Sequence, residues 1–193
     1  MQALIVVAHP DQGSFTHAAA GEVARAIVEA GHQVERVDLC EEGFDPRFGA
    51  ADLALFRSGA ALPDDVLAEQ RRLDRADALV LVYPIYWWSF PAILKGWIDR
   101  VFTSGWAYAE RPDGSLEKKL GHLDVHLLAV GGANLRTFAR HGYFAAMRTQ
   151  IDHGIFDYVG APVRSSELLL HPEAGFPDTA LATARRIGQQ VFA

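Results

Sequence analysis

Large side chains follow one another at the point where a predicted strand ends. Residues 78–83 form a short, β-branched apolar run that predicts a fully buried strand, and Pro84 ends it. The segment that follows contains Ile85, Tyr86, Trp87 and Trp88 and is too short to form a core of its own. Open α/β sheets bind their ligands at this carboxyl edge. Aromatic side chains beside exposed backbone amides would suit a planar ring with a polar edge, such as a flavin.

A polar segment follows the first predicted strand, residues 3–8. It runs from His9 to Thr16 and leads into a predicted helix whose first turn carries hydroxyl groups. Backbone amides at a helix start favour an anion, and Ser14 and Thr16 could donate to phosphate oxygens. The alternative interpretation is that Ser14 only caps the helix and that His9 is an ordinary polar residue. The G-x-G-x-x-G turn of dinucleotide-binding Rossmann folds is absent here.

Apolar runs alternate with helical patterns along the chain and predict a parallel sheet with helices on both faces, an α/β fold. The predicted strands are residues 3–8, 33–39, 78–83, 125–130 and 166–170. The predicted helices are residues 15–30, 67–75, 91–102, 145–159 and 179–192. We expect residues 41–63 to be irregular and the turn-rich residues 105–121 to form an excursion above the sheet. No linker or repeat divides the chain, so residues 1–193 are expected to form a single domain.

The composition excludes several classes of protein. Half of the 193 residues are hydrophobic, so we expect a sizeable core. The formal net charge of −6 argues against nucleic-acid binding, which requires a basic face. Cys40 is the only cysteine, so no internal disulfide can form, and no metal-ligand spacing is found. No leader pattern and no bilayer-length apolar run is found, so we expect a cytoplasmic protein without membrane insertion.

Three motifs resemble those of the NAD(P)H:quinone oxidoreductase family, which includes DT-diaphorase and the modulator of drug activity B. They are A-H-P-x(3)-S-F-T at residues 8–16, P-I-Y-W-W-S-F-P-A-I-L-K-G-W-I-D-R-V-F at 84–102 and W-A-Y at 106–108. The resemblance extends over nearly the whole chain and is weakest in the carboxy-terminal third. It implies a flavodoxin-like, doubly wound, five-stranded parallel sheet of order 2-1-3-4-5.

The same resemblance implies a flavoenzyme that binds FAD, with FMN as the alternative. Such an enzyme takes hydride from NADH or NADPH in a ping-pong reaction and passes two electrons to a quinone or another planar acceptor. It also implies a homodimer with active sites at the interface between subunits.

The family motifs assign roles to particular residues of this chain. For the flavin phosphate and ribityl region they imply His9, Ser14, Phe15 and Thr16, although many members have Asn where Thr16 stands. For the flavin ring they imply Pro84, Ile85, Tyr86, Trp87, Gly131 and Gly132. For the substrate they imply Trp88, Trp106 and Tyr108, so that Trp87 and these three form an apolar box. Tyr108 would cover the site of the partner subunit, and Gln70 matches a glutamine that reaches the cofactor from a partner chain.

One departure from the family concerns proton transfer. Family enzymes follow the double glycine with a tyrosine and then a histidine, whereas no tyrosine occurs here before Tyr143. His141 and Gly142 match the His-Gly pair of that pattern, so the resemblance implies His141 as the catalytic residue that delivers a proton. Two alternatives stay open. In the first, His141 is only a surface histidine at a helix start and takes no part in catalysis. In the second, Arg136 and Arg140 act instead as cations near the flavin or a dinucleotide phosphate.

Functions of two other classes also stay open. The first is a flavin-binding regulatory subunit of a potassium efflux system, for which residues 105–121 would supply a docking surface. The second is a flavodoxin-type carrier of single electrons, which needs no nicotinamide site. Among residues without an assigned function, Trp97 is expected in the core, and Asp99 and Arg100 are expected on a solvated helix face.

Overall fold

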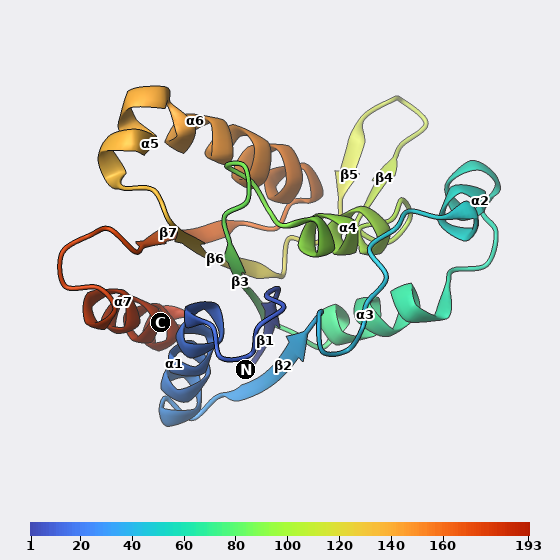
Figure 1. Cartoon of the computed structure of the whole chain (residues 1–193). Helices are drawn as coiled ribbons and strands as arrows, with labels where there is room; N and C mark the ends of the chain where they lie inside the picture. The colour runs from blue at the N-terminus through green and yellow to red at the C-terminus, as the bar shows by residue number, and fades with distance from the viewer.

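The centre of the molecule is a five-stranded parallel sheet (Figure 1), and the computed structural model describes residues 1–193. The strands of the sheet are β1 (Gln2–Val7), β2 (Gln33–Asp38), β3 (Ala78–Pro84), β6 (Asp124–Gly131) and β7 (Val163–Leu170). They lie in the order β2-β1-β3-β6-β7. Among the five strands this is the order 2-1-3-4-5, so the predicted flavodoxin-like topology is confirmed.

Strand β3 shows why the strands are continuous apolar runs. Each of its residues is buried, and alternate side chains face opposite sides of the sheet. Leu79 and Leu81 belong to one core cluster, whereas Val80 and Val82 belong to the other. A strand with helices on both faces has no solvent-exposed side, so it needs apolar residues at every position rather than at every second one.

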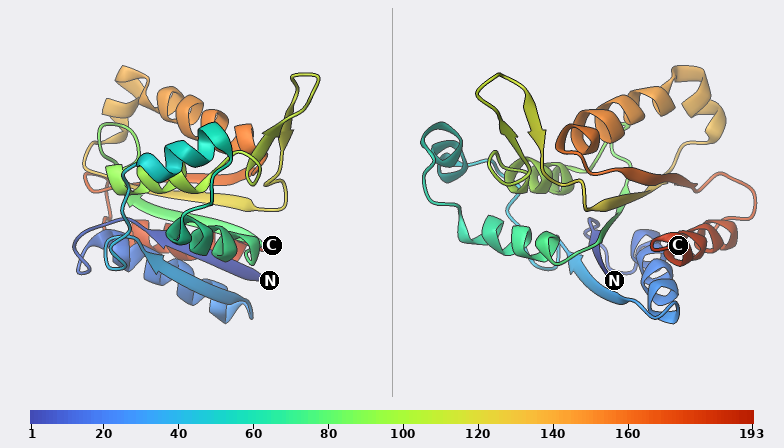
Figure 2. Two further views of the ribbon diagram at one scale, coloured as in Figure 1. Left: turned by 90° about the vertical axis from the view of Figure 1, so that its right-hand side faces the viewer. Right: turned by 180° about the vertical axis from the view of Figure 1, so that it is seen from behind.

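Helices cover both faces of the sheet (Figure 2). On one face α1 (Phe15–Glu29) packs against α7 (Asp178–Gln190). Gly188 allows this close packing, because a Cβ there would lie 2.6 Å from Val23 O. The other face is covered by α3 (Asp64–Asp74), α4 (Ala92–Val101) and the helical segment that precedes β7. No helix is both long enough and apolar enough to cross a bilayer.

The segment before β7 differs from the single helix predicted at residues 145–159. It forms α5 (Leu135–His141), α6 (Tyr143–Arg148) and a π-helix, η1 (Thr149–Asp157). Asn134 caps α5 by accepting a hydrogen bond from Thr137 N at 2.9 Å. Gly142 ends α5 with a φ of 71°, a left-handed conformation that glycine adopts without strain. The helical structure therefore begins ahead of residue 145 and is interrupted at Gly142.

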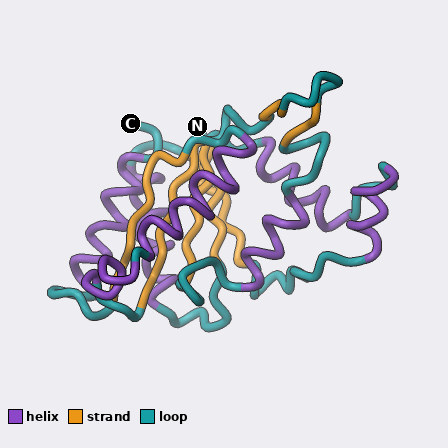
Figure 3. Tube along the Cα trace, turned by 90° about the horizontal axis from the view of Figure 1, so that it is seen from above, coloured by secondary structure: helices purple, strands orange, loops and turns teal.

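The prediction that residues 41–63 are irregular was wrong, because they contain α2 (Ala50–Ser58). Its start is fixed by Asp52, whose carboxylate accepts a hydrogen bond from Gly49 N at 2.7 Å. Gly59 ends it in a left-handed conformation. Residues 105–121 contain an antiparallel hairpin, β4 (Tyr108–Glu110) and β5 (Leu116–Lys118). The hairpin and α2 project beyond the sheet on the same side of the molecule (Figure 3).

Arg100 is buried rather than solvated, which corrects the expectation for its helix face. Only 6% of it is exposed. Its Nε donates to Asp52 at 3.0 Å, its Nη2 donates to Asp65 at 3.1 Å, and its Nη1 donates to the carbonyl oxygen of Asp45 at 2.8 Å. Asp99 is exposed as expected. Trp97 is fully buried, so its predicted place in the core is confirmed.

Candidate functional site

A cavity of about 320 Å³ lies at the carboxyl edge of the sheet, where β3 and β6 end. We call it the ring cavity. It is lined by Ile85, Tyr86, Trp87, Trp88, Gly131, Gly132, Ala133 and Phe138. Six of these eight residues had been assigned to flavin or substrate from the sequence, and they come from two motifs that are far apart along the chain. Pro84, the last residue of β3, is buried directly before the lining begins.

The aromatic loop of the ring cavity is a tight turn with an unusual backbone. Tyr86 and Ser89 exchange two backbone hydrogen bonds of 3.1 Å. The two central residues, Trp87 and Trp88, have φ angles of 50° and 61°. This is the turn geometry that normally selects glycine or asparagine, so each tryptophan stores about 1–3 kcal/mol of strain. Such strain is found mainly at binding and catalytic sites. Trp87 is 93% exposed and holds its indole in solvent.

The opposite wall of the ring cavity depends on two glycines. A Cβ on Gly131 would lie 2.8 Å from Leu170 Cδ2 and 3.1 Å from Ile85 Cδ1. Gly131 is therefore required for the close approach of β6, β7 and the aromatic loop. Gly132 differs, because a Cβ there would meet nothing within 4 Å. The absence of a side chain at Gly132 leaves its backbone open to the cavity.

Unpaired backbone amides border this apolar space. The N–H groups of Trp87, Trp88, Gly132 and Ala133 donate no hydrogen bond within the chain. Trp88 and Ala133 are half-buried, and amides removed from water are usually paired in folded proteins, so their free N–H groups beside aromatic walls could bind an external acceptor. A ring system with carbonyl oxygens and nitrogens along one edge supplies such acceptors.

A column of stacked rings connects the ring cavity to His141. Trp88 stacks on Tyr143 with ring centroids 3.6 Å apart, and Tyr143 stacks on His141 with centroids 5.4 Å apart. Phe138 meets the edge of Trp88 at 5.3 Å. The sequence comparison missed Tyr143 because it looked for a tyrosine ahead of His141. His141 and Arg136, the two candidates for proton transfer, are both exposed on α5.

The loop after β1 leads into α1 as predicted. Nδ1 of His9 lies 3.0 Å from Asp11 N and 3.1 Å from Asp11 O, so the His9 ring packs against the backbone of this loop. Ser14 caps α1, because its Oγ accepts from His17 N at 3.4 Å. The amides of Phe15 and Thr16 donate to no group in the chain. The first helical turn thus offers free N–H groups, whereas the Thr16 side chain is only 1% exposed.

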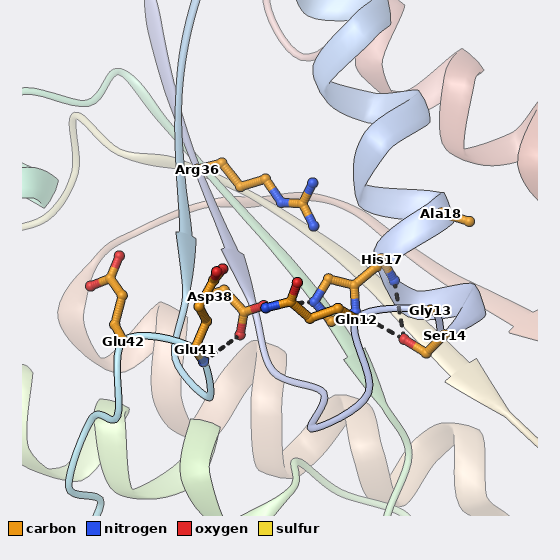
Figure 4. Close-up of a pocket in the computed structure, with 9 residues that line it drawn as sticks. All are labelled: Gln12, Gly13, Ser14, His17, Ala18, Arg36, Asp38, Glu41 and Glu42. Atoms are coloured by element: carbon orange, nitrogen blue, oxygen red, sulfur yellow. Dashed lines mark hydrogen bonds and ion pairs between the residues drawn. The ribbon is translucent and has the colours of Figure 1, made fainter.

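Sequence reasoning missed His17, which lies beside this helix start. It is the one titratable residue on the buried face of α1. Its Nδ1 lies 2.9 Å from Ser14 Oγ, and its Nε2 lies 2.7 Å from Asp38 Oδ2 (Figure 4). The three side chains border a polar cavity of about 560 Å³ that also includes Arg36 and Glu41. No sequence signal singled out His17, because it lies outside the apolar positions that define this helix and its partner Asp38 is far along the chain.

Asp38 keeps its negative charge inside this cluster. Burial alone would raise the pKa of its carboxyl group, but hydrogen bonds from His17 and from the amides of Glu41 and Cys40 outweigh that effect. The pKa of Asp38 is therefore held below its ordinary value. The amide bonds to Oδ1 measure 3.0 Å from Cys40 and 3.2 Å from Glu41.

One chain does not bring Trp106 and Tyr108 into the ring cavity. Trp106 packs near Phe102 and donates its indole N–H to Asp74 at 2.9 Å. Tyr108 lines a separate cavity of about 580 Å³, together with Phe56 and Arg100. The expected box of four aromatic residues is therefore not formed within a single chain.

Gln70 also has an internal role in this chain. It is 3% exposed, and its amide nitrogen donates to Val101 O and to Thr103 Oγ1, both at 2.9 Å. A side chain held in this way does not reach a neighbouring subunit. No group of three or more His, Cys, Asp or Glu side chains is placed to hold a metal ion.

Comparison with known proteins agrees with this geometry. Residues 1–189 match the family model described as a flavodoxin-like fold, Flavodoxin_2. The chain belongs to this family. This flavodoxin-like protein is 32% identical to an uncharacterized NAD(P)H oxidoreductase of Haemophilus influenzae, over 83% of this chain and 79% of the relative. It is 30% identical to the ribosyldihydronicotinamide dehydrogenase (quinone) of Rattus norvegicus, over 88% and 81% of the two chains.

A solved structure shows the same relationship for the flavodoxin-like protein. The NAD(P)H:quinone oxidoreductase from Methanothermobacter marburgensis superimposes with a TM-score of 0.89 at 30% sequence identity, covering 98% of each chain. The resemblance to NAD(P)H:quinone oxidoreductases stated from the motifs is thus confirmed over most of the chain. Its homologues include NAD(P)H dehydrogenase (quinone) enzymes.

Proposed function

We propose that this protein is a flavin-dependent NAD(P)H oxidoreductase that transfers two electrons to quinones or similar planar acceptors. The observation that carries the proposal is the ring cavity, where aromatic walls and unpaired amides surround one space at the carboxyl edge of the sheet. Ligands of open α/β sheets bind at this edge. Relatives of similar length that bear quinone dehydrogenase names support the same reaction class.

The residues present fit a flavin. The free amides of Trp87, Trp88 and Gly132 would donate to the polar edge of its ring, and the Gly131 backbone leaves space that a Cβ would fill. Ile85 and Phe138 would exclude water from the ring. When bound, a flavin supplies two-electron hydride chemistry that amino-acid side chains cannot supply.

The start of α1 would hold the phosphate of the cofactor. The unpaired amides of Phe15 and Thr16 and the positive end of the helix dipole favour an anion there. His9 would add a hydrogen bond from Nε2 in any form of the ring that carries a proton on that nitrogen. Thr16 would contact the phosphate through its backbone N–H alone, since its side chain is buried.

Within this proposal FAD is favoured over FMN. Phe15 lies 4.5 Å from Phe176 between ring centroids, and His171 stacks on Phe176 at 4.4 Å. These rings lie beside the proposed phosphate position and would provide a flat surface for an adenine ring. FMN lacks adenine and would gain nothing from them.

The acceptor and the nicotinamide would share one position next to the flavin, which gives a ping-pong reaction. Trp87 and Trp88 would hold each planar ring in turn, and such a flat apolar space selects molecular shape only weakly. His141, supported by Tyr143, would deliver the proton that accompanies the electrons. Arg136 is the competing candidate, because it lies on the same short helix.

A homodimer would complete the site. Tyr108 lines a cavity bordered by α2, and α2 with its preceding loop exposes Phe48 and Phe56, which are 51% and 68% accessible. Large apolar side chains grouped on one surface indicate a protein interface. In the proposed dimer each chain would place Tyr108 over the ring cavity of the other.

The decisive experiment combines cofactor identification with reduction. The purified protein is denatured, the released cofactor is identified by mass, and the intact protein is mixed anaerobically with NADH or NADPH before a quinone is added. We expect FAD, rapid bleaching by a nicotinamide, and reoxidation by the quinone. A protein that binds no flavin even when FAD and FMN are supplied contradicts the proposal. A bound flavin that neither nicotinamide reduces indicates a single-electron carrier instead.

A further inference from the structure

The Ser14–His17–Asp38 cluster has a defined arrangement of protons. Asp38 is ionised, and a carboxylate can only accept hydrogen bonds. The 2.7 Å contact therefore requires a proton on Nε2 of His17 in every charge state of the ring. The nitrogen that gains or loses a proton is Nδ1, which faces Ser14 Oγ at 2.9 Å.

The hydroxyl group of Ser14 must change roles when His17 titrates. With neutral His17, Nδ1 has a lone pair, so Ser14 donates its hydrogen to the ring and cannot donate elsewhere. With protonated His17, Nδ1–H donates to Ser14 Oγ, and the hydroxyl hydrogen is free for another acceptor. Ser14 caps α1, so the freed hydrogen is located at the helix start beside the unpaired amides of Phe15 and Thr16.

Charged groups of both signs surround His17. Asp38 at the end of β2 contacts it, and Glu41 and Glu42 of the following loop border the same cavity. Arg36 of β2 borders this cavity too and opposes a second positive charge. The ring of His9, at the end of β1, meets His17 edge-on with centroids 6.2 Å apart. Acidic and basic groups therefore both neighbour the ring, and histidine side chains in general change charge between about pH 5 and 8.

We propose that His17 is a positioning residue that couples binding of the flavin phosphate to the uptake of one proton. Protonation of Nδ1 frees the Ser14 hydroxyl to donate to a phosphate oxygen and adds a positive charge next to the helix start. Binding of the anion favours this protonated form in return, because linkage is reciprocal. The inference rests on the proposed function, since it takes the cofactor phosphate to lie at the start of α1.

The test compares FAD with riboflavin, which has the same ring and no phosphate. The flavin-free protein is titrated with each ligand between pH 5.5 and 8.5, and binding is followed by flavin fluorescence. The pyrophosphate of FAD keeps its charge over this range, whereas the phosphate of FMN does not. We expect FAD affinity to fall by about tenfold or more with rising pH, the size of a charge-assisted hydrogen bond, and riboflavin affinity to stay level. Calorimetry in two buffers of different ionisation enthalpy should show proton uptake with FAD only.

Two variants assign the effect to this cluster. His17→Gln should bind FAD with an affinity that no longer depends on pH. Ser14→Ala should weaken FAD binding at low pH more than at high pH, since the hydroxyl is available only at low pH. In the unmodified protein, the ¹⁵N resonance of His17 Nδ1 should shift to its protonated position when FAD binds, a readout that needs no variant.

The outcomes are distinguishable. FAD affinity that does not vary with pH, an equal pH dependence for riboflavin, or a His17 Nδ1 that stays unprotonated with FAD bound would each overturn the coupling. An unchanged slope in His17→Gln would do the same. Failure of every flavin to bind would instead overturn the proposed function itself.

Discussion

The indole ring of Trp88 lies flat against the phenol ring of Tyr143, with centroids 3.6 Å apart and planes inclined by 14°. Trp88 faces the ring cavity on one side and Tyr143 on the other, and His141 stacks behind Tyr143. A tyrosine and a histidine therefore stand together next to the cavity although their order along the chain is the reverse of the family pattern. Spatial neighbourhood, rather than sequence order, makes this pair a candidate for proton transfer.

His141→Ala should lower the rate of quinone reduction by about a hundredfold while leaving flavin affinity unchanged, because general acid catalysis is worth at least that much. Tyr143→Phe keeps the stacked ring and removes the hydroxyl, so a similar loss there would show that the tyrosine takes part. Arg136→Ala is the control on the same helix. Single-turnover reduction at several pH values is the measurement. A wild-type rate in His141→Ala together with a slow Arg136→Ala would transfer the role to the arginine.

Trp87→Gly should stabilise the fold and weaken function. Glycine relieves the left-handed strain at φ 50°, and the indole of Trp87 makes few contacts because it is 93% exposed. We expect the free energy of unfolding to rise by about 1 kcal/mol. The KM for a quinone should rise at the same time. Trp88→Gly relieves similar strain but loses the stack on Tyr143, so it should not stabilise. Urea unfolding of the flavin-free proteins makes the comparison, and a less stable Trp87→Gly would contradict the strain argument.

Gly131→Ala and Gly132→Ala form a matched pair of adjacent substitutions. The new methyl group at position 131 would lie 2.8 Å from Leu170 Cδ2, whereas at position 132 it meets nothing within 4 Å. We expect Gly131→Ala to lose about 1–3 kcal/mol of stability through overpacking, with a poorly formed ring cavity. Gly132→Ala should fold normally. Thermal unfolding and flavin titration of both variants check this, and equal behaviour of the two would show that the close approach of β6 and β7 is unimportant.

His126 should make the protein less stable in mild acid. Burial on β6 lowers its pKa below the ordinary value, and its Nδ1 is 2.8 Å from Ser165 Oγ. The unfolded chain then binds more protons than the folded chain, so stability falls as pH drops from about 6.5 through the folded-state pKa. The loss is about 1.4 kcal/mol for each unit of pKa shift. Urea unfolding at pH 5 and 7.5 should show this loss.

A nearby exposed histidine, His122, provides a control for this pH effect. His126→Asn should flatten the pH dependence of stability. His122→Asn should leave it unchanged, because His122 is exposed. If both variants keep the wild-type slope, another group is responsible for the acid sensitivity.

Phe56→Asp should convert a dimer to monomers. Phe56 is 68% exposed on α2 and borders the cavity that contains Tyr108. A charge there would have to be buried in the proposed interface, at a cost of several kcal/mol. Sedimentation velocity measures the oligomeric state, and quinone reduction should fall with it. Val28→Asp is the control, since Val28 is a 58% exposed apolar residue on α1, outside this surface. A wild-type protein that sediments as a monomer would refute the interface.

The sheet and the ring cavity were predictable because their signals are local. Each buried strand is an unbroken apolar run, and the lining of the cavity lies in two short motifs directly after strands. Helix α2 was not predictable in this way. Its start depends on the Asp52 carboxylate in its first turn, and its exposed Phe56 gives no apolar stripe. Tertiary contacts, rather than periodicity, hold it in place.

Buried polar partners were the other category that the sequence did not reveal. His17 reads as a surface residue until Asp38, far along the chain, is seen to lie 2.7 Å away. Arg100 reads as a solvated cation until Asp52 and Asp65 are placed around it. Pairing between distant residues cannot be inferred from composition or spacing in one sequence.

Arg100 anchors α2 to the rest of the molecule, because the buried guanidinium is bonded to Asp52 on that helix. Its guanidinium is tied to one carboxylate on α2, to another at the start of α3 and to a carbonyl oxygen of the connecting loop. Moving α2 outward would break the Asp52–Arg100 ion pair and leave the buried guanidinium with Asp65 and the Asp45 carbonyl oxygen only. The exposed Phe48 and Phe56 therefore lie on a loop and a helix that are both bonded to Arg100. A surface that already has its bound conformation before a second protein binds loses little conformational entropy on binding.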